Sequence, residues 1–176
     1  MLIDCHVHAC ADTPGHGKVS KYLARRWNFR FVRWRLGIPA DGGAALERQA
    51  EARLLETLDG AGPVEKAVVL AFDAVYDREG RPDRANTHLY VTNDYVAELA
   101  RRHPRVLFGA SVHPYRPDAV AELERCVGLG AVLMKWLPIV QNFDPSDERC
   151  LPFYEALAHH RLPLLCHTGG ERSLPN

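Results

Sequence analysis

The sequence lacks a net charge, a long apolar run and an even set of cysteines. Its 22 basic and 22 acidic side chains cancel over 176 residues, whereas nucleic-acid-binding domains usually carry a basic excess and disordered chains a strong net charge. The longest uninterrupted apolar run is the six residues 67–72, far short of the ~18 residues that suggest a membrane span. We therefore expect a globular protein with no nucleic-acid partner and no membrane span.

The amino-terminal residues and the cysteines predict a cytoplasmic location. Asp4, His6 and His8 fall where the apolar region of a secretory signal would have to begin. The five cysteines are odd in number and scattered, which is typical of reduced thiols rather than of a disulfide framework.

The sequence does contain an alternation of short apolar runs and segments with helical patterning. Five runs have strand character, namely residues 2–7, 65–72, 105–112, 131–137 and 162–167. Near-continuous apolar strands that alternate with helices are typical of an α/β fold with a parallel sheet buried on both faces. Helices are expected at 44–58, at 86–102 capped by Asn86, at 119–127 capped by Asp118, and after a cap at Ser146.

One segment between the first predicted strand and the first predicted helix departs from this alternation. Residues 18–35 carry seven basic side chains, five aromatic ones and no acidic one. Such a stretch could bind an anionic substrate, a partner chain or a membrane surface, although its aromatic side chains more often pack inward beneath a solvated face. Its position directly after His6 and His8 favours a lid or a subunit contact. We treat residues 16–40 as a basic-aromatic insert in a single domain that spans residues 1–176.

The strongest chemical signal is the pair His6 and His8 at the end of the first predicted strand. Alternate strand residues face one side about 6.6 Å apart, and two such imidazoles can bind one ion at roughly 2.0–2.1 Å. His167 ends the fifth strand, and ligands gather at the carboxyl ends of parallel strands. The alternatives are ordinary polar residues at strand ends. A zinc site that adds Cys5 and Cys10 is disfavoured, because Cys5 should lie buried on the opposite, helix-facing side.

A lysine and three further residues at predicted strand ends are also candidates. Lys135 lies in a strand that should be buried. Burial lowers the pKa of a lysine, so Lys135 could accept a proton or attack carbon dioxide, unless it reaches solvent or pairs with Asp73. Candidate substrate-binding residues are His113, Trp136 and Asp73. The alternatives are a satisfied core histidine for His113 and a loop cap for Asp73.

This ordered set of residues resembles the amidohydrolase superfamily, and more narrowly its amidohydrolase-related branch. That branch contains metal-dependent TIM-barrel hydrolases and relatives of aminocarboxymuconate semialdehyde decarboxylase. The resemblance is carried by residues 3–8, 134–138, 144–154 and 164–170. It implies a TIM-type (β/α)8 barrel, of which this chain contains only the first five βα units, since eight units need on the order of 300 residues.

The resemblance also implies a divalent metal ion, commonly zinc, bound by His6, His8 and His167. Lys135 and His167 are then the catalytic residues, and Lys135 could match a lysine that is carboxylated and bridges two metals in binuclear relatives. The implied reaction is hydrolysis of a small molecule, in which a metal-activated water attacks an amide, ester or lactone carbonyl. The alternatives are decarboxylation of a carboxylated substrate on the same barrel and a non-catalytic five-stranded ligand-binding domain.

Two functional residues of the resembled family have no counterpart in this sequence. These are a histidine that ends the sixth strand and an aspartate that ends the eighth. We therefore expect the chain to be incomplete for catalysis. An open sheet edge favours association, so we also expect pairing with another chain, for example as a homo-oligomer.

Overall fold

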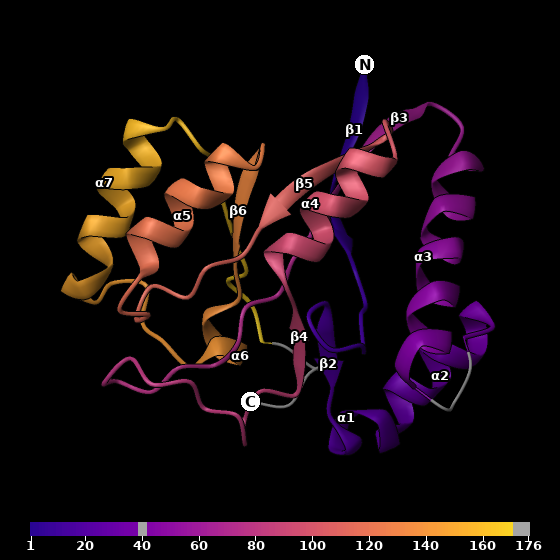
Figure 1. The fold of residues 1–176 in the computed structure, drawn as a ribbon, viewed down its shortest axis with the longest axis horizontal. Coiled ribbons are helices and arrows are strands. Elements are labelled where there is room, and N and C mark those ends of the chain that lie inside the picture. Colours follow the sequence, from indigo (N-terminus) through magenta and orange to yellow (C-terminus); the bar gives the residue numbers. More distant parts are fainter. Residues whose placement is uncertain (39–41, 171–176) are drawn as a thin grey trace.

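A computed structural model describes residues 1–38 and 42–170, and it contains a five-stranded parallel sheet with the strand order β1-β3-β5-β6-β7. The strands are β1 (Leu2–His8), β3 (Val64–Leu70), β5 (Val106–Ala110), β6 (Leu133–Trp136) and β7 (Leu164–Cys166). Three of them, β5, β6 and β7, lie wholly within the predicted apolar runs, and β1 and β3 each extend one residue beyond. The sheet curls and is flanked by helices (Figure 1), which is the arrangement of a partial TIM barrel and confirms the predicted fold class.

Helices connect consecutive strands of this sheet. They include α3 (Gly43–Asp59), α4 (Asn93–Arg102), α5 (Ala119–Gly128) and α7 (Leu151–His159). A short helix α6 (Pro138–Gln141) and a 3-10 turn η1 (Glu148–Cys150) precede α7. A separate antiparallel ribbon pairs β2 (Gly17–Val19) with β4 (Leu89–Val91), and the sequence patterns did not predict it.

The prediction of one helix over residues 86–102 was wrong in its first half. Asn86 does not cap a helix; its side chain donates a hydrogen bond to Asp83 (2.6 Å) within a turn. Strand β4 follows, and α4 begins only after Thr92, whose hydroxyl accepts a hydrogen bond from the amide of Tyr95 (3.2 Å). Pairing with the distant strand β2 therefore outweighs the local helical pattern.

The two other predicted caps also differ from expectation. Asp118 directly precedes α5, but its carboxylate pairs with the guanidinium of Arg116 (2.9 and 2.8 Å) and accepts no capping hydrogen bond from the helix. After Ser146, the side chain that caps is Asp147, which accepts a hydrogen bond from the amide of Arg149 (3.0 Å) and begins η1. Charge-assisted bonds to arginine are strong, and in Asp118 they engage both carboxylate oxygens.

The two faces of the sheet carry different apolar clusters. The larger cluster packs strand residues such as Val69 and Phe108 against the helices. The smaller cluster contains strand residues alone: Val68, Leu70 and Leu133, with Ile3, Leu107 and Leu165 packed against them. Because successive strand residues alternate between faces, Lys135 lies on this second face with Leu133. We call it the concave face.

The basic-aromatic insert forms β2, α1 (Lys21–Arg25) and α2 (Trp27–Leu36), while its residues 39 and 40 lie outside the described part. None of the residues of α2 is buried. The alternative in which the aromatic side chains pack inward does not hold for Trp27, Phe31 and Trp34 of this helix, which are exposed. Neither α2 nor any other helix in the described ranges has the length and apolar character needed to cross a membrane.

Candidate functional site

A bulge in β1 sets the direction of the two histidines of the first strand. In the pairing with β3, Asp4 lies opposite Ala67 and Val7 opposite Val69, so the two intervening residues of β1 face a single residue of β3. The carboxylate of Asp4 spans the bulge and accepts a hydrogen bond from the amide of His6 (2.9 Å). With one residue inserted, Ile3 and His6 share the concave face, which strict alternation would not allow.

The imidazoles of His6 and His8 converge. Their Nε2 atoms lie 3.1 Å apart, and their ring centroids lie 5.0 Å apart. Two nitrogens that bind one ion at 2.0–2.1 Å are separated by about 2.9–3.4 Å when the angle at the ion lies between about 90° and 110°. The observed spacing therefore fits two ligands of a single metal ion.

His167 and Lys135 lie at the same end of the concave face. Burial lowers the pKa of His6, and the positive charges of Lys135 and His167 lower it further, which places both groups within electrostatic reach of His6. Lys135 is 1% exposed. The Nε2 atom of His167 is buried and has no hydrogen-bond partner within the described residues. The fold thus gathers the four residues that the sequence singled out.

The described residues do not form a complete metal centre. Within residues 1–38 and 42–170, no three His, Cys, Asp or Glu side chains are placed so that they could hold an ion together. The Nε2 atoms of His6 and His8 converge. Nε2 of His167 has no hydrogen-bond partner within the described residues, but it does not converge with the other two nitrogens. Metal binding by the three histidines stays a prediction.

The cysteines differ from their predicted environments. Cys5 is exposed, because it lies in the bulge of an edge strand and not under a helix. Burial, together with the charges of Asp12 and Glu47, raises the pKa of Cys10 to about 12. Cys10 is therefore a protonated thiol at neutral pH in the metal-free protein.

His113 is fully buried, and the chain occupies both of its ring nitrogens. Nε2 donates a hydrogen bond to the carbonyl of Gln141 (2.8 Å), and Nδ1 accepts one from the amide of Tyr115 (3.1 Å). These two bonds define a neutral imidazole, and burial lowers the pKa of His113 to about 4. Contact with a substrate would require one of these bonds to break.

Asp73 and Trp136 are also buried. The carboxylate of Asp73 accepts a hydrogen bond from the amide of His113 (2.7 Å) and pairs with Arg116 (3.2 Å). The indole of Trp136 donates to a backbone carbonyl (2.8 Å). Its ring packs against the aromatic rings of Phe143, Phe153 and Tyr154. Both side chains stabilise loops and core, and a role in substrate binding stays a prediction.

Sequence reasoning missed the carboxylate that holds the loop after His8. Glu47 of α3 is buried, and its partners are the amide of Asp12, the hydroxyl of Thr13 and Nδ1 of His16, at 3.2, 2.6 and 2.6 Å. Burial opposes ionisation, but the hydrogen bonds from Thr13 and His16 outweigh it and lower the pKa of Glu47. The available signal was an acidic residue on the same helical stripe as Leu54 and Leu58.

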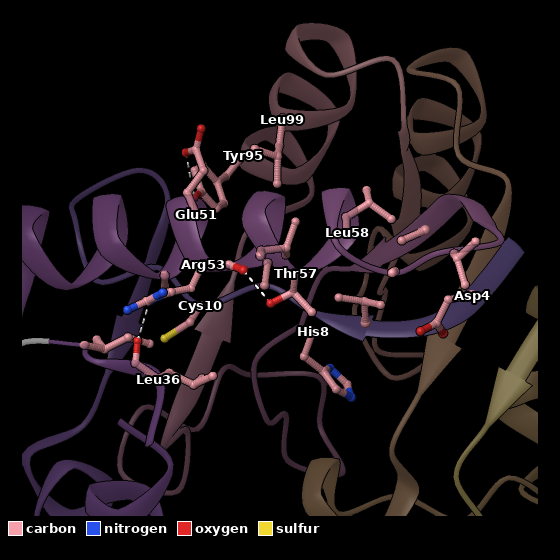
Figure 2. Close-up of a pocket in the computed structure, with 18 residues that line it drawn as sticks. Asp4, His8, Cys10, Leu36, Glu51, Arg53, Thr57, Leu58, Tyr95 and Leu99 are labelled. Atoms are coloured by element: carbon pink, nitrogen blue, oxygen red, sulfur yellow. Dashed lines mark hydrogen bonds between the residues drawn. The ribbon is translucent and has the colours of Figure 1, made fainter. Parts of the chain in front are cut away.

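A cavity of about 250 Å³ lies between β1 and α3. Its lining is mostly apolar, with Leu36, Leu58 and Leu99 among the contributors. Figure 2 shows the imidazole of His8 pointing away from α3 at the edge of this cavity. The cavity therefore lies on the helix side of β1, and His8 lines its edge while its imidazole points away.

Solved structures with the same fold are about twice as long as this chain. The 5-carboxyvanillate decarboxylase LigW2 of Novosphingobium aromaticivorans, solved with manganese and 3-methoxy-4-hydroxy-5-nitrobenzoic acid, matches with a TM-score of 0.57 and 18% identity over 95% of this chain and 50% of its own. A protein described as amidohydrolase II matches with a TM-score of 0.57 and 14% identity over 100% and 53%. The apo IDCase of Metarhizium anisopliae matches with a TM-score of 0.53 and 14% identity over 95% and 50%. This chain thus spans about half the length of these proteins.

The sequence itself gives the family. A comparison with curated proteins finds no match, but the family profile described as Amidohydrolase matches residues 3–175. The match covers the histidine pair, the strand of Lys135 and the strand that ends at His167, in the order that the resemblance required. The chain belongs to the amidohydrolase family.

Proposed function

We propose that this chain supplies the amino-terminal part of the active site of a metal-dependent hydrolase that acts on an amide, ester or lactone carbonyl of a small molecule. The observation that carries the proposal is the 3.1 Å approach of the Nε2 atoms of His6 and His8 at the carboxyl end of β1. The buried, unsatisfied Nε2 of His167 adds to it. A divalent ion, with zinc as the first choice, would supply an activated water and polarise the carbonyl.

Each of the gathered residues has a proposed role. His6, His8 and His167 bind the ion through neutral imidazole nitrogens, the form that metal binding requires. Asp4 is a positioning residue, because its carboxylate fixes the bulge from which His6 projects. Lys135 would accept a proton or, after attack on carbon dioxide, serve as a carbamate that is a further ligand. Its burial on the concave face favours the uncharged form on which both roles depend.

A decarboxylase of the same fold is the second candidate. The supporting observation is the fold shared with 5-carboxyvanillate decarboxylase, whose structure contains manganese and a substituted benzoic acid. The basic insert would attract a carboxylated substrate of this chain electrostatically. Release of carbon dioxide from an aromatic carboxylate would favour the decarboxylase, whereas release of an alcohol or amine from an ester or amide would favour the hydrolase.

We further propose that residues 1–176 are the amino-terminal part of one cytoplasmic barrel domain, interrupted by the insert at 16–40. The support is the continuous family match over residues 3–175 together with the half-length coverage of the solved structures. Turnover then requires the remaining strands of the barrel. For this reason the first test measures metal content instead of activity.

The metal assignment is tested with two double variants that each remove a pair of histidines. The chain is loaded with zinc or manganese, freed of excess metal and analysed by mass spectrometry, beside His6→Ala/His8→Ala. His159→Ala/His160→Ala is the matched control, because these neighbouring rings lie 4.9 Å apart at the end of α7, away from the sheet's histidines. We expect the control to retain the metal and the first variant to lose it. Equal metal in both variants would contradict the proposal.

A further inference from the structure

Helix α2 turns three aromatic side chains toward solvent. Trp27, Phe31 and Trp34 are 78%, 55% and 74% exposed. They occupy positions i, i+4 and i+7 and therefore form one stripe along the helix. Of the twelve large apolar side chains that are exposed in the described part of the chain, six lie between residues 22 and 36. A gathered apolar patch of this kind marks an interaction surface.

Cations flank the aromatic stripe on both sides. At about 100° per residue, Arg30 lies to one side of the line through Trp27, Phe31 and Trp34, and Arg35 lies to the other. Both arginines are exposed, as are Lys21 and Arg25 of the adjoining helix α1. No acidic residue occurs between positions 13 and 40 of the sequence, so this positive charge is not neutralised locally.

Both helices are held firmly on the body of the protein. Leu23 is completely buried and anchors α1. The guanidinium of Arg53 in α3 donates a hydrogen bond to the carbonyl of Leu36 (2.8 Å) at the end of α2. Gly37 then ends the helix in the left-handed conformation with φ of 66°. The stripe is therefore a fixed surface.

We propose that the surface formed by α1 and α2 docks on an anionic lipid bilayer. An interfacial helix of this type buries aromatic side chains at the level of the headgroups, while its arginines and lysines contact anionic lipids. Tryptophan and tyrosine prefer this boundary because their rings are apolar and carry one polar group. The stripe with Tyr22 beside it and arginines on both sides has this composition and geometry.

Charge and size favour a lipid surface over a protein partner. Self-pairing through this face would bring the arginines of two copies together, and like charges across an interface disfavour association. With ten residues, α2 is only about 15 Å long, and such a stripe falls short of the ~800 Å² per partner that specific protein interfaces bury. A bilayer needs no complementary surface and can contact every aromatic ring at once.

Docking would orient the candidate active site toward the lipid. Figure 1 shows α1 and α2 at the end of the sheet where β1 finishes, and β1 finishes with the histidine pair. The surface and the site thus share one end of the molecule. The proposal does not depend on the hydrolase assignment, since it uses no metal and no reaction.

Tryptophan fluorescence reports directly on this surface. The chain contains three tryptophans, and Trp136 is completely buried while Trp27 and Trp34 are exposed. The chain is titrated with phosphatidylcholine vesicles that contain or lack phosphatidylglycerol. We expect a blue shift and co-sedimentation with the anionic vesicles, at least about tenfold tighter than with the neutral ones and weakened by added salt.

Two charge-reversal variants provide the contrast. Arg30→Glu/Arg35→Glu removes the flanking cations, while Arg48→Glu/Arg84→Glu makes the same change at exposed arginines outside the surface. We expect only the first variant to lose vesicle binding. Equal binding by both variants, or no binding by the unaltered chain, would overturn the proposal. If the unaltered chain does not bind vesicles and Phe31→Ala forms a smaller oligomer, the stripe is a contact between copies of the chain. This result also would overturn the proposal.

Discussion

His113 binds a proton far less readily in the folded protein than in the unfolded chain. Its folded pKa is about 4 because of burial, against an unfolded value near 6.5. Between these values His113 is protonated in the unfolded state but not in the folded state. Its contribution to the free energy of unfolding is therefore fully present above about pH 6.5 and is lost as the pH falls toward 4. We expect this group to remove about 3 kcal/mol of unfolding free energy over that window.

The contribution of His113 is measured by urea unfolding at several pH values in the unaltered chain and in His113→Asn. The variant keeps an acceptor for the amide of Tyr115 but leaves the carbonyl of Gln141 unpaired, so we expect a loss of about 2 kcal/mol at pH 7. Between pH 6.5 and 4 its stability should fall less steeply than that of the unaltered chain. Parallel curves would show that His113 does not produce the acid sensitivity.

Residue type and position predicted that the strand-end residues lie at one end of the sheet, but not the partners of each side chain. His6, His8 and His167 could be found because each ends an apolar strand, and such ends meet in a parallel sheet. The partner of Asp73 could not be found in this way. Its carboxylate pairs with Arg116, a residue from another loop, and no local pattern links two side chains so far apart in the chain.

The bulge in β1 is the element that aims His6. Replacing Asp4 by Ala removes the carboxylate that accepts the amide of His6, and we expect metal affinity to fall by about tenfold, as it does for supporting residues of metal ligands. Asp4→Asn keeps an acceptor oxygen and should retain most of the affinity. Competition with a chromophoric zinc chelator measures all three proteins. Equal affinities would show that the bulge forms without this bond.

The cap of α4 is a second local determinant that can be tested alone. The hydroxyl of Thr92 accepts a bond from the amide of Tyr95 and donates one to the carbonyl of Gly15 (3.0 Å), which joins the helix to the loop that precedes β2. Thr92→Ala should lower the unfolding free energy by about 1–2 kcal/mol. Thr92→Ser keeps the hydroxyl and should cost much less. Thermal unfolding of both variants distinguishes a cap from simple loss of side-chain volume.

Elements that follow from local patterns were predicted, and elements that depend on distant pairing were not. The five strands of the main sheet are nearly continuous apolar runs, so burial on both faces defines them. Strands β2 and β4 have three residues each and are defined by pairing with distant segments, namely with each other and, for Val91 of β4, with Phe72. The sequence left the orientation of α2 open. An amphipathic helix usually turns its apolar stripe inward, whereas the stripe of α2 faces solvent.

The sheet as a whole has two outer strands, β1 and β7. Among the described residues β1 pairs only with β3 and β7 only with β6, so each presents one unpaired row of backbone groups. Exposed edges of this kind pair with other chains. The half-length match to (β/α)8 relatives agrees with this topology, since a closed barrel leaves no edge strand.

The unpaired outer edges of β1 and β7 should make this chain associate as its concentration rises. Leu2 of β1 is 52% exposed, and a charge there should disfavour edge pairing, because lysine on an edge strand blocks the approach of another strand. We expect Leu2→Lys to lower the weight-average mass in analytical ultracentrifugation at a given concentration. Leu151→Lys is the matched control, because Leu151 is 55% exposed but lies on α7, away from β1. An equal decrease in both variants would assign the association to general hydrophobic contact, and the absence of concentration dependence would show that the open edges are protected within the chain itself.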